Sequence, residues 1–242
     1  MCDLRDAAGV RQIVTELRPD VVVHAQAMSN VDQAQEDPPA ARAMNVDTTR
    51  HLADAAAETS AVLITISTDY VFDGTKGSPY DEADVPRPLS VYGDTKLQSE
   101  RVTLALASGF VVRVGTLFGP GRATFCERVI TQAHAAQPVE AFEDQVTSPT
   151  FTDDVAETLA KLVRLMDGPG GAVLPSRVLH VANTGACSRV EFARTIIQFV
   201  GGSTACLRPV RMTDQQRPAP RPAYSALTSR YLTAILGGTL RP

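Results

Sequence analysis

The sequence has no tryptophan, and lysine occurs only at positions 76, 96 and 161 of its 242 residues. No apolar run approaches the ~18 residues that a membrane span needs, and acidic side chains interrupt the first six positions, unlike a signal peptide. The net charge is −4 and no stretch is strongly basic, which argues against a nucleic-acid or anionic-membrane partner. We therefore expect a cytoplasmic protein.

Paired cysteines and clustered metal ligands are also missing. The histidines show no ligand spacing and the cysteines form no CxxC pair, so we predict reduced thiols and no metal site. His24 and His180 fall on predicted strands, where a histidine is more often a hydrogen-bonded core residue than a ligand. The cysteines are Cys2, Cys126, Cys187 and Cys206.

What the sequence does contain is a regular alternation of strand-like and helix-like segments. Short, continuous apolar runs are typical of strands buried in a parallel sheet, and they occupy residues 21–23, 61–67, 110–114 and 178–182. Helices are predicted from apolar spacing and capping residues over 10–17, 46–58, 91–107, 122–136, 152–166 and 188–200. The pattern predicts an α/β fold with a doubly wound parallel sheet, which binds ligands at the carboxyl ends of its strands.

The strongest chemical pattern is YGDTK, which places Tyr92 and Lys96 four residues apart on one face of a helix starting near Val91. Thr68 ends the preceding strand, so its hydroxyl can face Tyr92. A nearby ammonium would lower the pKa of a tyrosine from its usual ~10 and make it an acid or base near neutral pH. The alternative is a solvated helix face, and the spacing from a buried strand favours the catalytic interpretation.

Several blocks of the sequence resemble the dTDP-4-dehydrorhamnose reductase family of extended short-chain dehydrogenases/reductases. The resemblance is nearly colinear over the whole chain. It implies a Rossmann-like sheet, incomplete at the N-terminus, with a small C-terminal substrate lobe. The blocks are RPDVVVHAQAMSNVDQAQEDP (18–38), STDYVFDGTKGSPYDEAD (67–84), PLSVYGDTKLQSE (88–100), DQVTSPTFTDDVA (144–156) and RPAPRPAYSAL (217–227).

The resemblance also implies a reaction, the NAD(P)H-dependent reduction of the C4 carbonyl of a nucleotide-linked 4-keto-6-deoxy sugar. By the family's pattern, hydride passes from the nicotinamide to the carbonyl carbon and Tyr92 protonates the resulting alkoxide. Lys96 would bind the nicotinamide ribose and tune Tyr92. Thr68 and Asp69 would lie against the sugar.

One residue separates reduction from dehydration. Related nucleotide-sugar dehydratases carry Thr-Asp-Glu at this strand end and need the acid pair to expel water. This chain has Thr68-Asp69-Tyr70, so simple carbonyl reduction is favoured, with Asp69 and Tyr70 at the substrate. A loop-capping pair is the alternative role for these two residues.

The cofactor site departs from the family's pattern. Relatives begin with a strand and a GxxGxxG turn that holds the diphosphate of the cofactor, and this sequence has no such motif. We expect a chain shortened at both ends, lacking about three strands and one helix at its start. The cofactor is predicted to be NADPH or NADH. Its candidate ligands, for which packing and turn roles are the alternative, are Asp3, Leu4, Ala25, Gln26, Ala27, Met28, Ser29, Tyr92 and Lys96.

The nucleotide site departs as well. In the family an aromatic side chain stacks on thymine, and its position here is Thr116, another candidate substrate residue. The sequence therefore leaves the identity of the base open.

The predicted division of the chain is a partial dinucleotide-binding core over residues 1–115 and 144–182, with a substrate lobe over 116–143 and 183–242. Two other functions stay open. One is a non-catalytic binding subunit similar to the β regulatory subunit of methionine adenosyltransferase, and the other is an inactive fragment. The predicted partners are a nucleotide-sugar substrate and a second copy of the chain in a homodimer.

Overall fold

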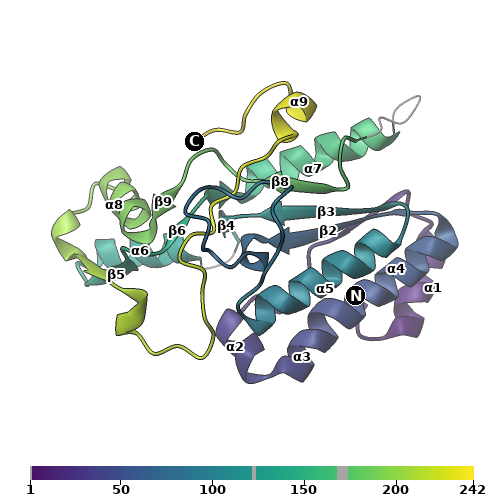
Figure 1. The fold of residues 1–242 in the computed structure, drawn as a ribbon, viewed down its shortest axis with the longest axis horizontal. Coiled ribbons are helices and arrows are strands. Elements are labelled where there is room, and N and C mark those ends of the chain that lie inside the picture. The colour runs from purple at the N-terminus through teal and green to yellow at the C-terminus, as the bar shows by residue number, and fades with distance from the viewer. Residues whose placement is uncertain (1, 122–123, 168–173) are drawn as a thin grey trace.

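A four-stranded parallel sheet forms the centre of the computed structural model, which describes residues 2–121, 124–167 and 174–242 (Figure 1). The strands lie in the order β1-β2-β3-β8, so the predicted parallel arrangement is confirmed. Each strand begins or ends within two residues of its predicted bounds. The strands are β1 (Val21–His24), β2 (Val62–Thr68), β3 (Gly109–Val114) and β8 (Val178–Val181).

Helices cover both faces of the sheet because successive strand residues are apolar. Leu63 points to a cluster formed with α1 (Ala7–Leu17) and α4 (Thr48–Thr59), and α5 (Val91–Ala105) packs on the same side. The next residue, Ile64, belongs to the opposite cluster with α7 (Thr152–Asp167) and α9 (Leu232–Leu236). β1 forms one edge of the sheet, where Val23 is 44% exposed.

The helix predicted over residues 46–58 is present as α4, within two residues of its predicted bounds, and helical segments that were not predicted precede it. Two short helices precede it, α2 (Val31–Glu36) and α3 (Pro38–Arg42), followed by a π-helical segment, η1 (Ala43–Asp47). The two short helices have their own caps, because Asn30 and Asp37 accept hydrogen bonds from backbone amides of the first turns. These capping residues were the signal that apolar periodicity alone missed.

A separate cluster lies at one end of the molecule, at the left of Figure 1. Val129 of α6 (Phe125–His134) and Ile197 of α8 (Arg189–Phe199) pack there on two parallel strands. The capping box opened by Ser188 is present as predicted. The first positions of the helix predicted over 122–136, residues 122 and 123, lie outside the described residues. The two strands are β5 (Val139–Phe142) and β10 (Leu207–Val210).

Residues 144–150, where the sequence predicts neither a helix nor a strand, contain short strands. Residues 144–150 include β6 (Val146–Thr147) and the start of β7 (Pro149–Phe151), which pair with β9 (Cys187–Ser188) and β4 (Thr116–Phe118). Strands of two or three residues give too little apolar alternation to be recognised. The remaining short helical turns are η2 (Asp69–Val71), η3 (Thr204–Cys206) and η4 (Met212–Asp214).

The C-terminal segment returns to the sheet. Leu232 is buried in the cluster around Leu162 and Leu179, so the last residues pack on the core although the predicted lobe included them. The two-part division is kept as a proposal, with this segment moved to the core.

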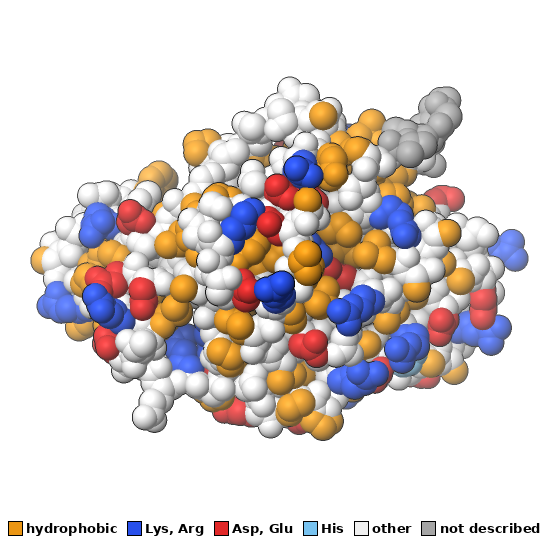
Figure 2. Space-filling model, viewed as in Figure 1, with side chains coloured by type: hydrophobic (Ala, Val, Ile, Leu, Met, Phe, Trp, Pro, Cys, Tyr) orange, Lys and Arg blue, Asp and Glu red, His pale blue; other side chains and the backbone are white. Residues whose placement is uncertain are grey.

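The visible surface in Figure 2 carries basic and acidic side chains interspersed, without a continuous basic area among its described residues. No helix in the described part of the chain is long and apolar enough to cross a membrane. Within the same residues, no group of three or more histidine, cysteine or acidic side chains is arranged to hold a metal ion.

Candidate active site

The helix that carries Tyr92 and Lys96 begins where predicted, at Val91. Ser90 caps it by accepting a hydrogen bond from the amide of Gly93, at 3.2 Å. A Cβ atom at Gly93 would overlap the backbone carbonyl oxygen of Tyr70. Glycine in the YGDTK pattern therefore allows the first turn of α5 to lie directly against η2, which follows β2.

Thr68 and Tyr92 are brought together, as the sequence predicted. Burial raises the pKa of Tyr92 to about 12, and side-chain hydrogen bonding with Thr68 acts in the opposite direction. The expected lowering of this pKa by Lys96 is not found, because removal of the phenol from water is the largest effect. Tyr92 is thus protonated at neutral pH and can serve as a proton donor.

Lys96 is buried, with 3% of its surface exposed. Burial lowers its pKa from 10.5 to about 8, with Glu100 acting to raise it. Its ammonium has no hydrogen bond or ion pair with any residue that the structure describes. Its Nζ atom is not among the fully buried polar atoms that lack a partner in the described residues, so it keeps some contact with solvent and leaves three donors for a bound ligand.

The charge of Lys96 also affects His24, at the carboxyl end of β1. Burial, and then the ammonium of Lys96, lower the pKa of His24 to about 4. Its Nε2 lies 3.1 Å from the Thr49 hydroxyl. His180 is equally buried, with Nδ1 at 3.0 Å from the carbonyl oxygen of Thr228. Both are hydrogen-bonded core histidines, as predicted.

The predicted cofactor loop, residues 25–29, is tied to the catalytic helix by a residue that sequence reasoning missed. Asn45 lies in η1 and is buried. Its Oδ1 accepts from the amide of Met28 at 2.7 Å, and its Nδ2 donates to the hydroxyl of Thr95 at 3.0 Å. Thr95 directly precedes Lys96, so this one amide sets the loop against the catalytic helix.

The other cofactor candidates lie in two places. Ala25 and Ser29 are exposed on the loop after β1, whereas Gln26 is partly buried there. Asp3 pairs with Arg5, and the carbonyl oxygen of Leu4 lies 2.8 Å from Nδ1 of His51 on α4. Ala27 belongs to the same partly buried loop as Gln26.

The described residues fit the nicotinamide half of a dinucleotide. The Oε1 atom of Gln26 is buried and has no hydrogen-bond partner in the described part of the chain, which leaves an unsatisfied acceptor in the loop that Asn45 fixes. The partnerless ammonium of Lys96 supplies donors for ribose hydroxyls. Together with Tyr92, these groups offer the donors and acceptors that a nicotinamide riboside requires.

Asp69 is 3% exposed and lies beneath the substrate side of the site. Burial raises its pKa, while hydrogen bonds from Ser225 and Thr68 act to lower it. The Ser225 hydroxyl donates at 2.5 Å and the Thr68 hydroxyl at 3.0 Å. Asp69 therefore orients the hydroxyl of Thr68. A contact between Asp69 and a sugar stays a prediction.

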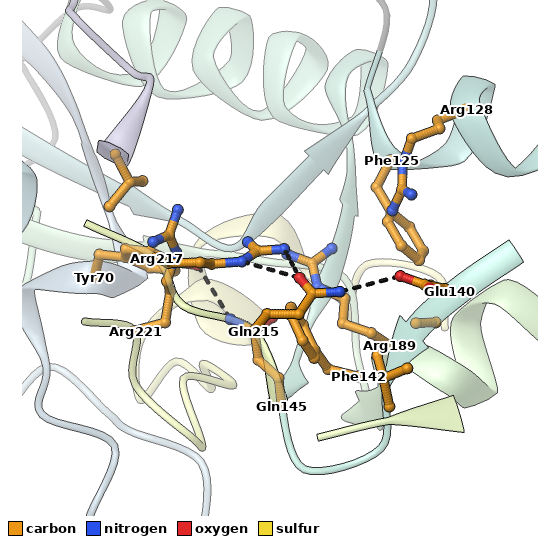
Figure 3. A pocket seen from close by; sticks show the side chains of 13 residues that line it. Tyr70, Phe125, Arg128, Glu140, Phe142, Gln145, Arg189, Gln215, Arg217 and Arg221 are labelled. Carbon is orange, nitrogen blue, oxygen red and sulfur yellow. Dashed lines mark hydrogen bonds between the residues drawn. The ribbon is translucent and has the colours of Figure 1, made fainter. Parts of the chain in front are cut away.

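Tyr70 links Tyr92 to a pocket. Its ring meets that of Tyr92 edge to face, with centroids 6.0 Å apart, and its hydroxyl accepts from Nε2 of Gln145 at 3.2 Å. Both Tyr70 and Gln145 line a pocket of about 370 Å³ between the sheet and the α6–α8 lobe (Figure 3).

Four arginines from distant parts of the chain line this pocket, and none was predicted as a site residue. Figure 3 shows the guanidinium groups of Arg189, Arg217 and Arg221 directed into the same space. A basic side chain has no signature in a single sequence that separates a pocket from a solvated surface. The block RPAPRPAYSAL did mark two of them as part of the resemblance. The four are Arg128, Arg189, Arg217 and Arg221.

Arg221 also joins the two sides of the cleft. Its Nη1 and Nη2 each donate to a carboxylate oxygen of Asp32 at 2.6 Å, and the amide of Ala219 donates to the same carboxylate at 3.2 Å. Asp32 lies on α2, directly after the cofactor loop. This bidentate pair connects the loop after β1 with the C-terminal part of the pocket.

Thr116, predicted to lie near the nucleotide base, touches the pocket through Arg189. Its Oγ1 accepts from Nη2 of Arg189 at 3.1 Å and lies 2.9 Å from Oγ1 of Thr147. Thr116 does not itself line the pocket, so its role in substrate contact stays a prediction.

The parallel sheet, the tyrosine–lysine helix and the adjoining pocket define a class, the Rossmann-like, NAD(P)-dependent oxidoreductases of the short-chain dehydrogenase/reductase type. The family model for the RmlD substrate binding domain matches residues 1–242. The chain belongs to this family, that of the dTDP-4-dehydrorhamnose reductases, as the sequence predicted.

Named relatives agree with this assignment. The chain is 38% identical to dTDP-4-dehydrorhamnose reductase of Streptomyces griseus, over 97% of this chain and 77% of the relative. It is 32% identical to dTDP-4-keto-6-deoxy-D-glucose reductase of Streptomyces niveus, over 93% of this chain and 76% of the relative. The crystal structure of dTDP-4-dehydrorhamnose reductase from Bacillus anthracis, in complex with NADP, superposes with a TM-score of 0.89 at 30% identity, over 99% of this chain and 82% of that one. These relatives give no support to the regulatory-subunit alternative.

Proposed function

We propose that this protein reduces the C4 carbonyl of a nucleotide-linked 4-keto-6-deoxy sugar with NADPH or NADH, in deoxysugar biosynthesis. The observation that carries the proposal is the placement of Tyr92 between Thr68 and Tyr70, with Tyr70 forming the wall of the arginine pocket. A sugar whose nucleotide lies in that pocket brings its ring to the phenol of Tyr92. The names of the relatives, reductases of dTDP-linked keto sugars, support this substrate class.

Each residue of the site has a separate role in the proposed reduction. A bound nicotinamide supplies the hydride that reaches the carbonyl carbon. Tyr92, held protonated by burial, donates its proton to the carbonyl oxygen as charge develops there. Lys96 would hold the ribose hydroxyls of the bound cofactor through its ammonium. Thr68 donates its one hydroxyl hydrogen to Asp69 and also hydrogen-bonds with the phenol of Tyr92, so it positions that phenol.

Reduction is favoured over dehydration because position 70 holds a tyrosine. Tyr70 is largely enclosed, and burial raises its pKa, so it stays a neutral phenol. Its hydroxyl is engaged by Gln145. It cannot act as the carboxylate that water elimination needs next to Asp69.

The test is turnover by the 242-residue protein, followed by oxidation of the reduced nicotinamide. Substrates are dTDP-linked and UDP-linked 4-keto-6-deoxy sugars, each with NADPH and with NADH. We expect turnover, and a loss of at least about 100-fold in kcat for Tyr92→Phe, the lower end of the range for a general acid. Tyr231→Phe, which removes a phenol on the far side of the sheet, is the matched control and should retain full activity.

The absence of turnover with all of these combinations would refute the proposal. Equal kcat values for the Tyr92→Phe variant and the parent protein would refute the assignment of the proton donor. A homodimer in a cytoplasmic setting stays part of this proposal, and light scattering of the purified protein tests the oligomeric state.

A further inference from the structure

The carboxyl group of Asp69 is buried among hydroxyl groups. In the described part of the chain, the side chains that bond its two oxygens are those of Thr68, Thr147 and Ser225, and none of these is a cation. Burial raises the pKa of Asp69, while the hydroxyls of Ser225 and Thr68 and the charge of Arg189 act to lower it. A buried carboxylate without a paired cation is costly, so this environment favours a carboxyl group that takes up and releases a proton.

On one side, Asp69 reaches Tyr92 through a single hydroxyl. Oγ1 of Thr68 lies 3.0 Å from Oδ1 of Asp69 and also hydrogen-bonds with the phenol of Tyr92. A hydroxyl donates one hydrogen and accepts others, so the same separation serves both charge states of the carboxyl group. Thr68 donates to a charged Asp69. A protonated Asp69 donates to Thr68 instead, which frees the hydroxyl hydrogen of Thr68 for the oxygen of Tyr92.

On the other side, two further hydroxyls lead from Asp69 to the arginine pocket. Oγ1 of Thr147 lies 3.5 Å from Oδ2 of Asp69, which is long for a hydrogen bond, so this link must shorten before a proton crosses it. Oγ1 of Thr147 is 2.9 Å from Oγ1 of Thr116. Thr147 is fully buried, whereas Thr116 is partly exposed and accepts from Arg189 of the pocket at 3.1 Å. A row of exchangeable hydrogens therefore runs from the edge of the pocket to the phenol.

The proposed reduction creates a need for such a row. In each turnover the bond between the phenol oxygen of Tyr92 and its hydrogen breaks, a new O–H bond forms on the substrate, and Tyr92 is left as a phenolate. Burial raises the pKa of Tyr92 to about 12, so this phenolate is a strong base. It must regain a proton before the next turnover.

We propose that Asp69 is a proton relay that acts through Thr68 and restores the proton of Tyr92 after each reduction. The phenolate takes the hydrogen of Thr68 as Thr68 takes the proton of the Asp69 carboxyl group, so one O–H bond forms for each that breaks. Asp69, now a carboxylate, regains its proton from water at the arginine pocket through Thr116 and Thr147. The inference rests on the proposed function, in which Tyr92 is the proton donor, and goes beyond it in assigning the route by which the proton returns.

Rapid mixing of the Asp69→Asn variant with reduced nicotinamide and a dTDP-linked 4-keto-6-deoxy sugar, both in excess, tests the relay. Asparagine keeps the shape of the side chain and an acceptor for Thr68, but it has no acidic proton to pass on. Because Tyr92 is protonated at the start, the first equivalent of cofactor should be oxidised within about twofold of the parent's rate. Later turnovers should be at least about tenfold slower. A substitution that merely displaces Tyr92 or the sugar would slow the first turnover as well.

A second variant interrupts the row beyond Asp69. Thr147→Val leaves Asp69 and Thr68 in place and should show the same fast first turnover and slow later ones. Thr150→Val is the matched control, because its hydroxyl is equally buried but bonds the carbonyl oxygen of Ser148, outside the row. Both phases of this control should match those of the parent protein, and circular dichroism verifies that each variant is folded.

Heavy water distinguishes proton return from slow release of product. The slow phase of the Asp69→Asn and Thr147→Val variants should be slower still in heavy water, because it is limited by movement of a proton. A slow phase that heavy water leaves unchanged would assign the delay to product release and overturn the relay.

Two other outcomes would also overturn the relay while turnover by the parent protein upholds the proposed reaction. One is a first turnover of Asp69→Asn that is slowed as much as the later ones, and the other is a steady rate equal to that of the parent. If the parent protein turns over none of the keto sugars, the proposed reaction is refuted and the relay with it.

Discussion

Replacing Lys96 by methionine is expected to stabilise the protein at neutral pH while removing the ammonium that the proposed reaction uses. The folded state lowers the pKa of this group from 10.5 to about 8. Because one pKa unit is worth about 1.4 kcal/mol, holding the charged form in the folded protein costs about 3 kcal/mol at pH 7. Methionine keeps most of the side-chain volume and removes this cost.

The stability difference between Lys96→Met and the parent protein depends on pH. Below pH 8 the lysine is protonated in both states and the full cost applies. Between pH 8 and 10.5 the unfolded chain binds more protons than the folded one, so the free energy of unfolding of the parent protein rises. Above pH 10.5 both states are neutral and the advantage of Lys96→Met disappears.

Urea unfolding monitored by far-ultraviolet circular dichroism measures this difference, since the chain has no tryptophan to report by fluorescence. Lys76→Met is the matched control, because Lys76 is partly exposed and paired with Asp84 at 2.5 Å. It should lose up to about 1 kcal/mol. A Lys96→Met variant that is less stable than the parent at pH 7, or a difference that does not change with pH, would refute the reasoning.

Two other substitutions test buried polar groups around the site. The side chain of Glu100 is only 2% exposed, and Arg113→Met removes its bidentate partner. This variant should lose about 3–5 kcal/mol in the free energy of unfolding, measured in urea at neutral pH. Asn45→Ala releases the cofactor loop from Thr95 and should raise the KM for NADPH about tenfold, as expected for about 1–3 kcal/mol of lost buried hydrogen bonding, with a smaller change in kcat.

Each of these has a matched comparison on the same protein. Arg11→Met breaks an exposed pair with Glu58 and should cost less than about 1 kcal/mol. Asn183→Ala removes a buried amide bonded to Asp154, away from the cofactor loop, and should leave the KM for NADPH unchanged. Equal losses for the exposed and the buried arginine, or equal KM values for the two asparagine variants, would contradict these explanations.

The sheet could be predicted from the sequence because continuous apolar runs indicate buried strands. Leu63 and Ile64 face opposite clusters, and only a strand covered on both sides is apolar at both positions. The convergence of Tyr92 with Thr68 was predictable for a related reason, since a strand end and the next helix start are neighbours in a parallel α/β fold.

The features of the site that the sequence did not predict depend on contacts between distant segments. Asn45 lies just before the helix predicted over residues 46–58, and its role appears only where η1 meets Met28 and Thr95. Arg189 follows a capping serine and reads as an ordinary helix residue. The sequence predicted a lowered pKa for Tyr92, whereas burial raises it, because burial of the phenol cannot be inferred from its spacing to Lys96.

The pair between Asp32 and Arg221 joins residues 189 positions apart in the sequence. All four strands of the central sheet are complete by Val181, before either Arg217 or Arg221 has been synthesised. A chain growing from the ribosome can therefore form the helix of Tyr92 and Lys96 well before the arginine pocket closes. Contacts over such separations form late and slowly, so the arginine pocket should be the last part of this protein to mature.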